Sequence, residues 1–246
     1  MNAEDPFAQA YFRLTAQVGT ERGSHSEDPA RPETVQAMQI VLEIPKAQPP
    51  VRSDLLAAAA RSVVAVCFDE RAATDPIWRE SLSAWYDHLI RKVVRRARNQ
   101  AWLKVQDLPG VTVNQQGAQA RAFIPSPVSE VNALVGKLQI SGTELPRDLP
   151  DALDPQRPVI FIDAGLKMST GKAAAQVGHA SMLLAAAQPL EWVRDWAASG
   201  FELSVRELES ASFASRIKDP RAVLVRDAGY TEVAPDSLTV CALPEP

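Results

Sequence analysis

Three polar residues recur at helical spacing between Leu166 and Ala180. Lys172, Gln176 and His179 are separated by four and then three residues, which places them on one face of a helix. An ammonium, an amide and an imidazole in a row can hold an anion, orient a water molecule or exchange a proton. This face is the first candidate site, and a solvated helix face with a structural histidine is the alternative.

Gly171 and Lys172 stand where this helix is expected to begin. Free backbone N–H groups, the positive helix end and an ammonium can together bind a phosphate or a developing oxyanion, although a plain helix start fits as well. Five residues separate Gly165 from Gly171, and Ala173 follows the lysine. A nucleotide-binding phosphate loop needs four residues there and then Ser or Thr, so this class of site is excluded.

A second polar segment, Asp227-Ala-Gly-Tyr-Thr231, directly follows an apolar stretch that reads as a strand. A turn after such a strand can present a carboxylate and a hydroxyl at the edge of a sheet. The same residue types are also ordinary turn formers. The segment is therefore a candidate site or a simple turn.

The two segments together carry a family resemblance. Leu166-Lys-Met-x-x-Gly-Lys-x-Ala-Ala-Gln-x-x-His-Ala180 and Arg226-Asp-Ala-Gly-x-Thr-x-Val-Ala-Pro-x-Ser-x-Thr-Val240 resemble the motifs of the type 2 peptidyl-tRNA hydrolase family, over about residues 157–243. The resemblance implies a compact α/β domain that hydrolyses the ester joining a peptide to the terminal ribose of tRNA. It implies no required metal and no organic cofactor.

The resemblance also implies roles for individual residues. We expect Asp227, with Thr231, to orient or activate water, and Lys172 to stabilise the tetrahedral oxyanion or hold a terminal phosphate. We expect His179 to assist proton transfer to the ribose leaving group. The expected substrate-binding residues are Lys167, Gly171, Gln176, Arg226 and Gly229. The chain departs from the family pattern at Asp163, Gly165 and Ser169-Thr170, which removes or reverses charge beside the motif.

Composition restricts the remaining possibilities. The formal net charge is −4 and the chain has two cysteines and three histidines, so we expect neither a broadly basic nucleic-acid surface nor a zinc cluster or disulfide framework. No apolar run is long enough to span a bilayer, and the N-terminus does not resemble a signal peptide. These features predict a cytoplasmic protein. A non-catalytic module that binds RNA or protein on the same scaffold is the alternative function.

The chain divides into an expected disordered tail at residues 1–33, an N-terminal α/β domain at 34–150 and a hydrolase-like domain at 157–246. The last domain follows the order β-α-α-β-α-β-β, which predicts a small mixed sheet covered by helices. The first half shows a similar broad order, either by chance or as a degenerate repeat. If it is a repeat, we expect a monomeric pseudo-dimer, and otherwise a homodimer.

A basic run, Arg91-Lys-Val-Val-Arg-Arg-Ala-Arg98, lies within a long helix expected at residues 78–104. Helical spacing would place Arg91, Arg95 and Arg98 on one face. Such a face can bind phosphates, so we expect possible tRNA contacts there. A merely solvated charged face is the alternative.

Overall fold

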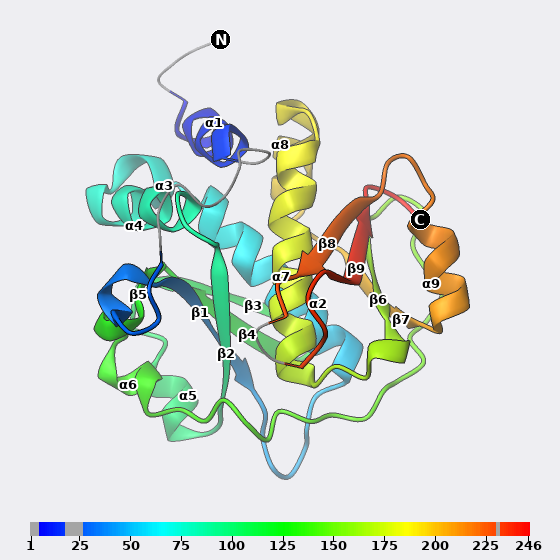
Figure 1. Cartoon of the computed structure of the whole chain (residues 1–246), viewed down its shortest axis with the longest axis horizontal. Helices are drawn as coiled ribbons and strands as arrows, with labels where there is room; N and C mark the ends of the chain where they lie inside the picture. The colour runs from blue at the N-terminus through cyan, green and yellow to red at the C-terminus, as the bar shows by residue number, and fades with distance from the viewer. Residues whose placement is uncertain (1–4, 18–26, 230–231) are drawn as a thin grey trace.

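The computed structural model describes residues 5–17, 27–229 and 232–246, which form two α/β units side by side (Figure 1). Each unit is a mixed sheet with helices packed against it. In these ranges no helix is both long and apolar enough to cross a membrane. The predicted fold class, a small mixed sheet covered by helices, is confirmed in the second unit.

The second unit has the predicted order of elements. They are β6 (Val159–Asp163), α7 (Thr170–Ala187), α8 (Leu190–Ala198), β7 (Ser204–Leu208), α9 (Ser210–Arg216), β8 (Val223–Asp227) and β9 (Ser237–Leu243). The sheet order is β7-β6-β9-β8, with β6 parallel to β7 and antiparallel to β9. Strand β6 is buried on both faces: Ile160 and Ile162 belong to the core that includes α7, whereas Phe161 packs with Phe213 of α9. A strand covered on both sides needs the continuous apolar run seen in its sequence.

The first unit repeats this architecture. Its elements are β1 (Gln36–Glu43), α2 (Arg52–Phe68), α3 (Arg71–Thr74), α4 (Pro76–Tyr86), β2 (Arg91–Ala97), α5 (Gln100–Lys104), β3 (Gly110–Gln115), β4 (Ala118–Phe123), the short β5 (Ser126–Pro127) and α6 (Ala133–Gly136). The sheet order is β2-β1-β4-β3, with β1 parallel to β2 and antiparallel to β4. Strand for strand, the order and directions equal those of the second sheet.

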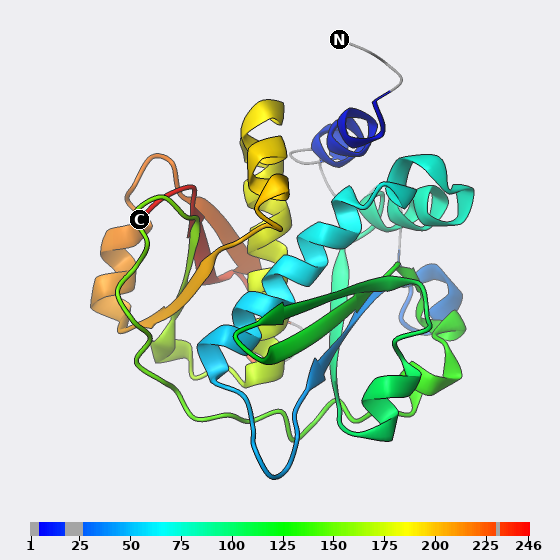
Figure 2. The ribbon, with the colours of Figure 1, turned by 180° about the vertical axis from the view of Figure 1, so that it is seen from behind.

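The two units meet through α2 and α7, which cross in Figure 2. The Ser181 hydroxyl donates to the carbonyl of Ala60 at 2.7 Å, and a Cβ on Gly178 would lie 2.9 Å from Cγ2 of Val63. Counted from the first residue of each helix, Ala60 corresponds to Gly178 and Val63 to Ser181. The two contacts are therefore exchanged copies of one another, as in a two-fold symmetric interface.

The expected disordered tail is wrong for residues 6–17, which form helix α1 (Pro6–Gln17). Ala10 and Leu14, one helical turn apart, are buried in the main core. The Tyr11 hydroxyl donates to the carbonyl of Gln188 at 2.8 Å. The segment is ordered because apolar residues recur on one helical face and meet the core. Residues 1–4 and 18–26 of the expected tail lie outside the described residues.

The prediction of one long helix at residues 78–104 is also wrong. Helix α4 ends at Tyr86, and the basic run forms strand β2, parallel to β1 from the pair Ala37 and Arg91 onward. Val93 and Val94 favour a strand, and β1 supplies the hydrogen-bonding partner. Between residues 128 and 138 only a 3₁₀ turn (Val128–Glu130) and the short α6 form.

Candidate active site

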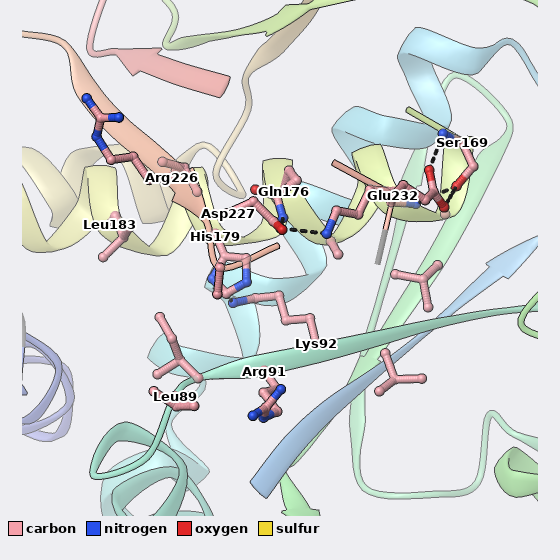
Figure 3. Close-up of a pocket in the computed structure, with 18 of the residues that line it drawn as sticks. Leu89, Arg91, Lys92, Ser169, Gln176, His179, Leu183, Arg226, Asp227 and Glu232 are labelled. Atoms are coloured by element: carbon pink, nitrogen blue, oxygen red, sulfur yellow. Dashed lines mark hydrogen bonds and ion pairs between the residues drawn. The ribbon is translucent and has the colours of Figure 1, made fainter. Parts of the chain in front are cut away.

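A pocket of about 800 Å³ lies where the start of α7, strand β8 and strand β2 face one another (Figure 3). The second unit lines it with Lys172, Gln176, His179 and Asp227. The first unit contributes Lys92 and apolar residues that include Leu89 and Val94. The pocket therefore belongs to both units, and the sequence motifs account for only one of its walls.

Asp227 is the centre of the polar wall. Its Oδ2 accepts hydrogen bonds from Lys172 Nζ at 2.5 Å and from Gln176 Nε2 at 2.8 Å, while Oδ1 accepts from the Gly229 backbone at 2.8 Å. The Lys172 and Asp227 side chains are only 11% and 8% exposed. Three donors fix the plane of this carboxylate, and low exposure strengthens its attraction to the ammonium.

The Gln176 side chain is fixed by a second hydrogen bond, made by its amide oxygen. The hydroxyl of Thr239, on β9, donates to Gln176 Oε1 at 2.6 Å, and both side chains are buried. Because the amide oxygen accepts from the threonine, the amide NH₂ is turned toward Asp227. The chain Thr239–Gln176–Asp227 thus joins β9, α7 and β8. Thr239 stands in the second sequence motif but was not among the predicted site residues, because a threonine inside a strand gives no signal of its own.

The start of α7 differs from the expected backbone anion site. The N–H of Gly171 donates to Thr143 Oγ1 at 3.0 Å, and the N–H of Lys172 donates to Ser169 Oγ at 3.0 Å. Glu232 accepts from the N–H and hydroxyl of Ser169 at 2.8 and 2.6 Å. These N–H groups already have acceptors within the chain, and a carboxylate already faces the helix start. The Lys172 side chain, rather than the backbone of the helix start, is the cationic group that the start of α7 brings to this pocket.

His179 lies one turn beyond Gln176 and faces the first unit (Figure 3). Its Nδ1 is 3.0 Å from Nζ of Lys92 on β2. Lys92 was not among the predicted site residues, because the basic run was expected to be helical. The β-branched pair Val93-Val94 was the sequence signal that favours a strand, in which Lys92 and Val94 share one face.

The other predicted site residues lie in different surroundings. Arg226 lines the pocket but is exposed and donates to the backbone of Asp236 at 3.1 Å. Gly229 has φ +80°, and a Cβ there would lie 2.5 Å from the backbone nitrogen of Pro235. Lys167 lines a separate, smaller pocket. Thr231 lies outside the described residues.

The predicted basic helix face does not exist. Arg91 and Arg95 are on a strand, and Arg98 follows its last residue. Arg91 pairs with Glu27 at 2.5 Å, and Arg95 donates to the carbonyl of Leu138 at 2.9 Å. These arginines therefore do not share a helix face, which was the reason for expecting them to contact tRNA together.

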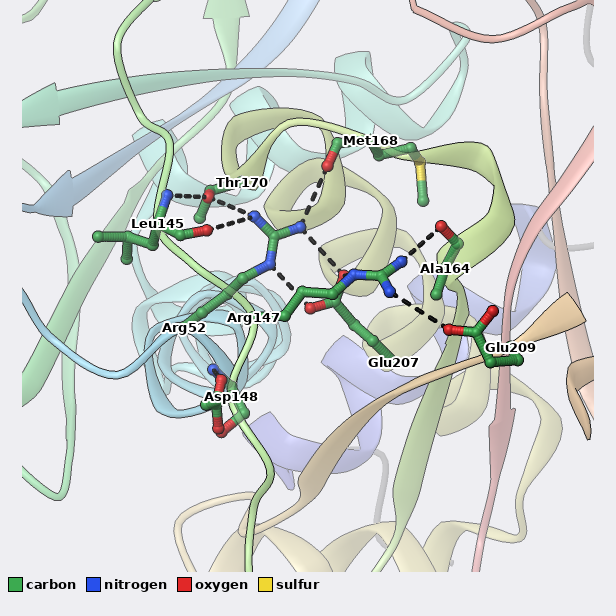
Figure 4. A network of polar contacts seen from close by, with 10 residues as sticks. Arg52, Leu145, Arg147, Asp148, Ala164, Met168, Thr170, Glu207 and Glu209 are labelled. Atoms are coloured by element: carbon green, nitrogen blue, oxygen red, sulfur yellow. Dashed lines mark hydrogen bonds and ion pairs between the residues drawn. The ribbon is translucent and has the colours of Figure 1, made fainter.

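The loop that leads into α7 is anchored by Arg52 of the first unit (Figure 4). Arg52 is 4% exposed and donates to the Met168 carbonyl at 3.1 Å, to Thr170 Oγ1 at 2.5 Å and to Glu207 at 2.8 Å. Arg147 also contacts Glu207, at 3.5 Å. The first residue of α2 thus fixes the first residue of α7, two residues before Lys172.

The donor set suits ester hydrolysis by water. A buried carboxylate can orient a water molecule, and an adjacent ammonium can stabilise the negative charge of a tetrahedral intermediate. Within residues 5–17, 27–229 and 232–246, no three His, Cys, Asp or Glu side chains gather as a metal site would require.

Comparison with known proteins matches the second unit to a single family. The family described as "Peptidyl-tRNA hydrolase PTH2" matches residues 157–246. A peptidyl-tRNA hydrolase of Staphylothermus marinus is 34% identical over 94 residues, which cover 35% of this chain and 78% of that protein. Peptidyl-tRNA hydrolases of Thermococcus onnurineus and Methanopyrus kandleri are 36% and 39% identical, and the matched segments cover 35% and 33% of this chain and 80% and 77% of those proteins. The residues matched by the family, 157–246, contain the second unit.

Proposed function

The chain belongs to the peptidyl-tRNA hydrolase PTH2 family, and we propose that it hydrolyses the ester between a peptide, or an N-blocked amino acid, and tRNA. The observation that carries the proposal is the buried contact between Lys172 and Asp227 at the wall of the pocket. These two residues come from motifs 55 residues apart in the chain. They meet at the positions where the family resemblance expects the reacting groups.

In the proposed reaction, Asp227 orients a water molecule toward the ester carbonyl. Its carboxylate is fixed by Lys172, Gln176 and Gly229, so little reorganisation is needed when charge develops. The Lys172 ammonium stabilises the oxyanion, because an ammonium has three donor hydrogens and its contact with Asp227 places it beside the proposed water. Water attacks the ester carbonyl directly, so no acyl-enzyme forms. Asp227 accepts a proton from the attacking water, the tetrahedral intermediate breaks its bond to the ribose oxygen, and that oxygen takes up the proton as tRNA leaves. Thr231, at a position implicated in the family's activity, completes the proposed catalytic set.

We further propose that the domain boundaries at residues 34–150 and 157–246 separate a degenerate repeat from the catalytic domain, in a monomeric pseudo-dimer. The matching strand orders and the exchanged contacts between α2 and α7 support this proposal. Counted from the helix starts, Asp54 and Arg61 stand where Lys172 and His179 do. The repeat therefore lacks the reacting groups, and the proposal gives one active site per chain.

A release assay tests the function. Purified protein is expected to free the acyl group from N-acetyl-aminoacyl-tRNA, and Lys172→Ala or Asp227→Asn is expected to lower kcat by about 10²–10³-fold. Lys104→Ala, at an exposed position on α5, is the matched control for loss of a positive charge. Binding of tRNA without release would support the non-catalytic module instead. Release that does not depend on the tRNA body would indicate a general esterase.

Light scattering tests the pseudo-dimer. A mass near that of one 26.7 kDa chain is expected over a wide concentration range. A stable homodimer would overturn this part of the proposal without affecting the proposed chemistry.

A further inference from the structure

Lys92 reaches the site from the edge strand of the opposite unit. Its Nζ lies 3.0 Å from His179 Nδ1, 3.3 Å from Met182 Sδ and 4.7 Å from the centroid of the Trp85 ring. The Trp85 indole is fixed in turn by a 2.9 Å hydrogen bond to the Arg91 carbonyl. A cation seated over an indole face and against a thioether has a defined position, so Lys92 meets His179 in a defined geometry.

Helix α7 is shaped to admit this side chain. A Cβ on Gly178, next to His179, would lie 3.3 Å from Cδ of Lys92. The absence of a side chain on Gly178 therefore lets the aliphatic stem of Lys92 lie along the helix while its ammonium reaches the imidazole.

The contact determines where the imidazole proton lies. An ammonium is a donor with no acceptor, so Nδ1 of His179 must accept. A protonated imidazole has two N–H donors and no acceptor, and therefore only the neutral ring can make this hydrogen bond. The single proton of the neutral ring is then on Nε2.

We propose that Lys92 is a positioning residue, which holds His179 as the neutral Nε2–H tautomer. His179 then serves as a hydrogen-bond donor to the ester carbonyl or the ribose oxygen, and not as a base toward water. A neutral histidine used as an electrophile is a known catalytic device. The first unit thereby completes a site whose motifs lie wholly in the second. The donor role rests on the proposed hydrolase function, but the tautomer does not.

Nuclear magnetic resonance of ¹⁵N-histidine-labelled full-length protein tests the tautomer. The chain has three histidines, and His179→Ala identifies the signal of interest. Two-bond ¹H–¹⁵N correlations are expected to show His179 protonated at Nε2 alone in the native chain. Lys92→Met keeps the stem and removes the donor, so a mixture of tautomers is expected. An Nδ1-protonated ring in the native chain, or an unchanged signature in Lys92→Met, overturns the proposal.

Kinetics test whether Lys92 acts through His179. Lys92→Met is expected to lower kcat about ten- to hundred-fold with less change in KM, because a donor that is no longer oriented still occupies the site. In the His179→Ala background the same substitution is expected to have almost no further effect. Lys92→Arg retains a donor-only cation and is expected to recover part of the activity. Lys104→Met is the matched control for charge.

If the effects of Lys92→Met and His179→Ala on kcat are fully additive, Lys92 does not act through His179 and the positioning role is overturned. If the native chain releases no peptide from tRNA, the proposed function fails, but the native spectrum still decides the tautomer. If Lys92→Met does not fold, the native spectrum and the Lys92→Arg chain still decide the proposal.

Discussion

Arg52 and Glu207 form a two-bond ion pair, at 2.8 and 3.1 Å, that joins the first turn of α2 to strand β7. Their side chains are 4% and 14% exposed. The same guanidinium holds the Met168 carbonyl and the Thr170 hydroxyl. A contact between residues 155 positions apart thus sets both the junction of the two units and the start of α7.

Removing the Arg52 side chain should destabilise the whole chain. We expect Arg52→Met to lower the free energy of unfolding by about 3–5 kcal/mol, because it leaves Glu207 as a buried charge without its main partner. Urea denaturation measures the change. Arg31→Met is the control, since the Arg31–Glu33 pair is 65% and 53% exposed and should contribute less than about 1 kcal/mol. Similar losses for both variants would contradict the anchoring role of Arg52.

Thr239 should affect catalysis although it lies behind the site. We expect Thr239→Val to lower kcat about tenfold, because the Gln176 amide loses the hydrogen bond that turns its NH₂ toward Asp227. Steady-state release assays measure the effect. Thr74→Val, at an exposed position of α3, should leave kcat unchanged. An unaltered kcat in Thr239→Val would show that Asp227 needs no support from Gln176.

The crossing of α2 and α7 should not tolerate a side chain at Gly178. A Cβ there would lie 2.9 Å from Val63, so Gly178→Ala should cost about 1–3 kcal/mol through overpacking, despite the better helix propensity of Ala. Adding Val63→Ala should restore part of the loss, which a double-mutant cycle would detect. Gly136→Ala is the control, because its Cβ would meet only Val131, at 3.9 Å. If Gly178→Ala costs the same free energy of unfolding with and without Val63→Ala, the contact with Val63 is not the cause.

Stability should fall at alkaline pH through Cys67. Burial raises the pKa of the Cys67 thiol from 9.0 to about 11. The unfolded chain therefore loses this proton at lower pH than the folded chain, and the stabilisation present below pH 9 is lost as pH rises toward 11. The loss should reach about 2–3 kcal/mol. Unfolding free energies of the native chain and Cys67→Ala, compared from pH 8 to about 11, measure it. If the unfolding free energies of the two chains change with pH in the same way, the prediction is contradicted.

The sequence predicted the second unit well because its signals are local. Lys172, Gln176 and His179 share a face of α7 by spacing alone, and the apolar run of β6 is buried on both faces. The predicted order of strands and helices followed from apolar runs and turn residues along the chain. Asp227 was recognisable because it directly follows the apolar stretch of β8, of which it is the last residue.

The same local signals failed in the first unit. The run from Arg91 to Ala97 has helical spacing and no strict alternation of apolar and polar residues, and its pairing with β1 makes it a strand. Helix α1 packs Ala10 and Leu14 into the main core, and this contact makes it a helix of the folded chain. In both cases the partner that decides the conformation is distant in sequence.

By itself, the sequence determined which side chains could do chemistry and the fold of the unit that carries them, since these depend on residue type and on spacing within one element. Only the tertiary structure decided that Lys92 faces His179, that Arg52 anchors the start of α7 and that Glu232 faces the same helix start. These contacts join residues 63 to 118 positions apart. Their formation depends on the packing of two sheets through a shared helix crossing, which no local pattern encodes.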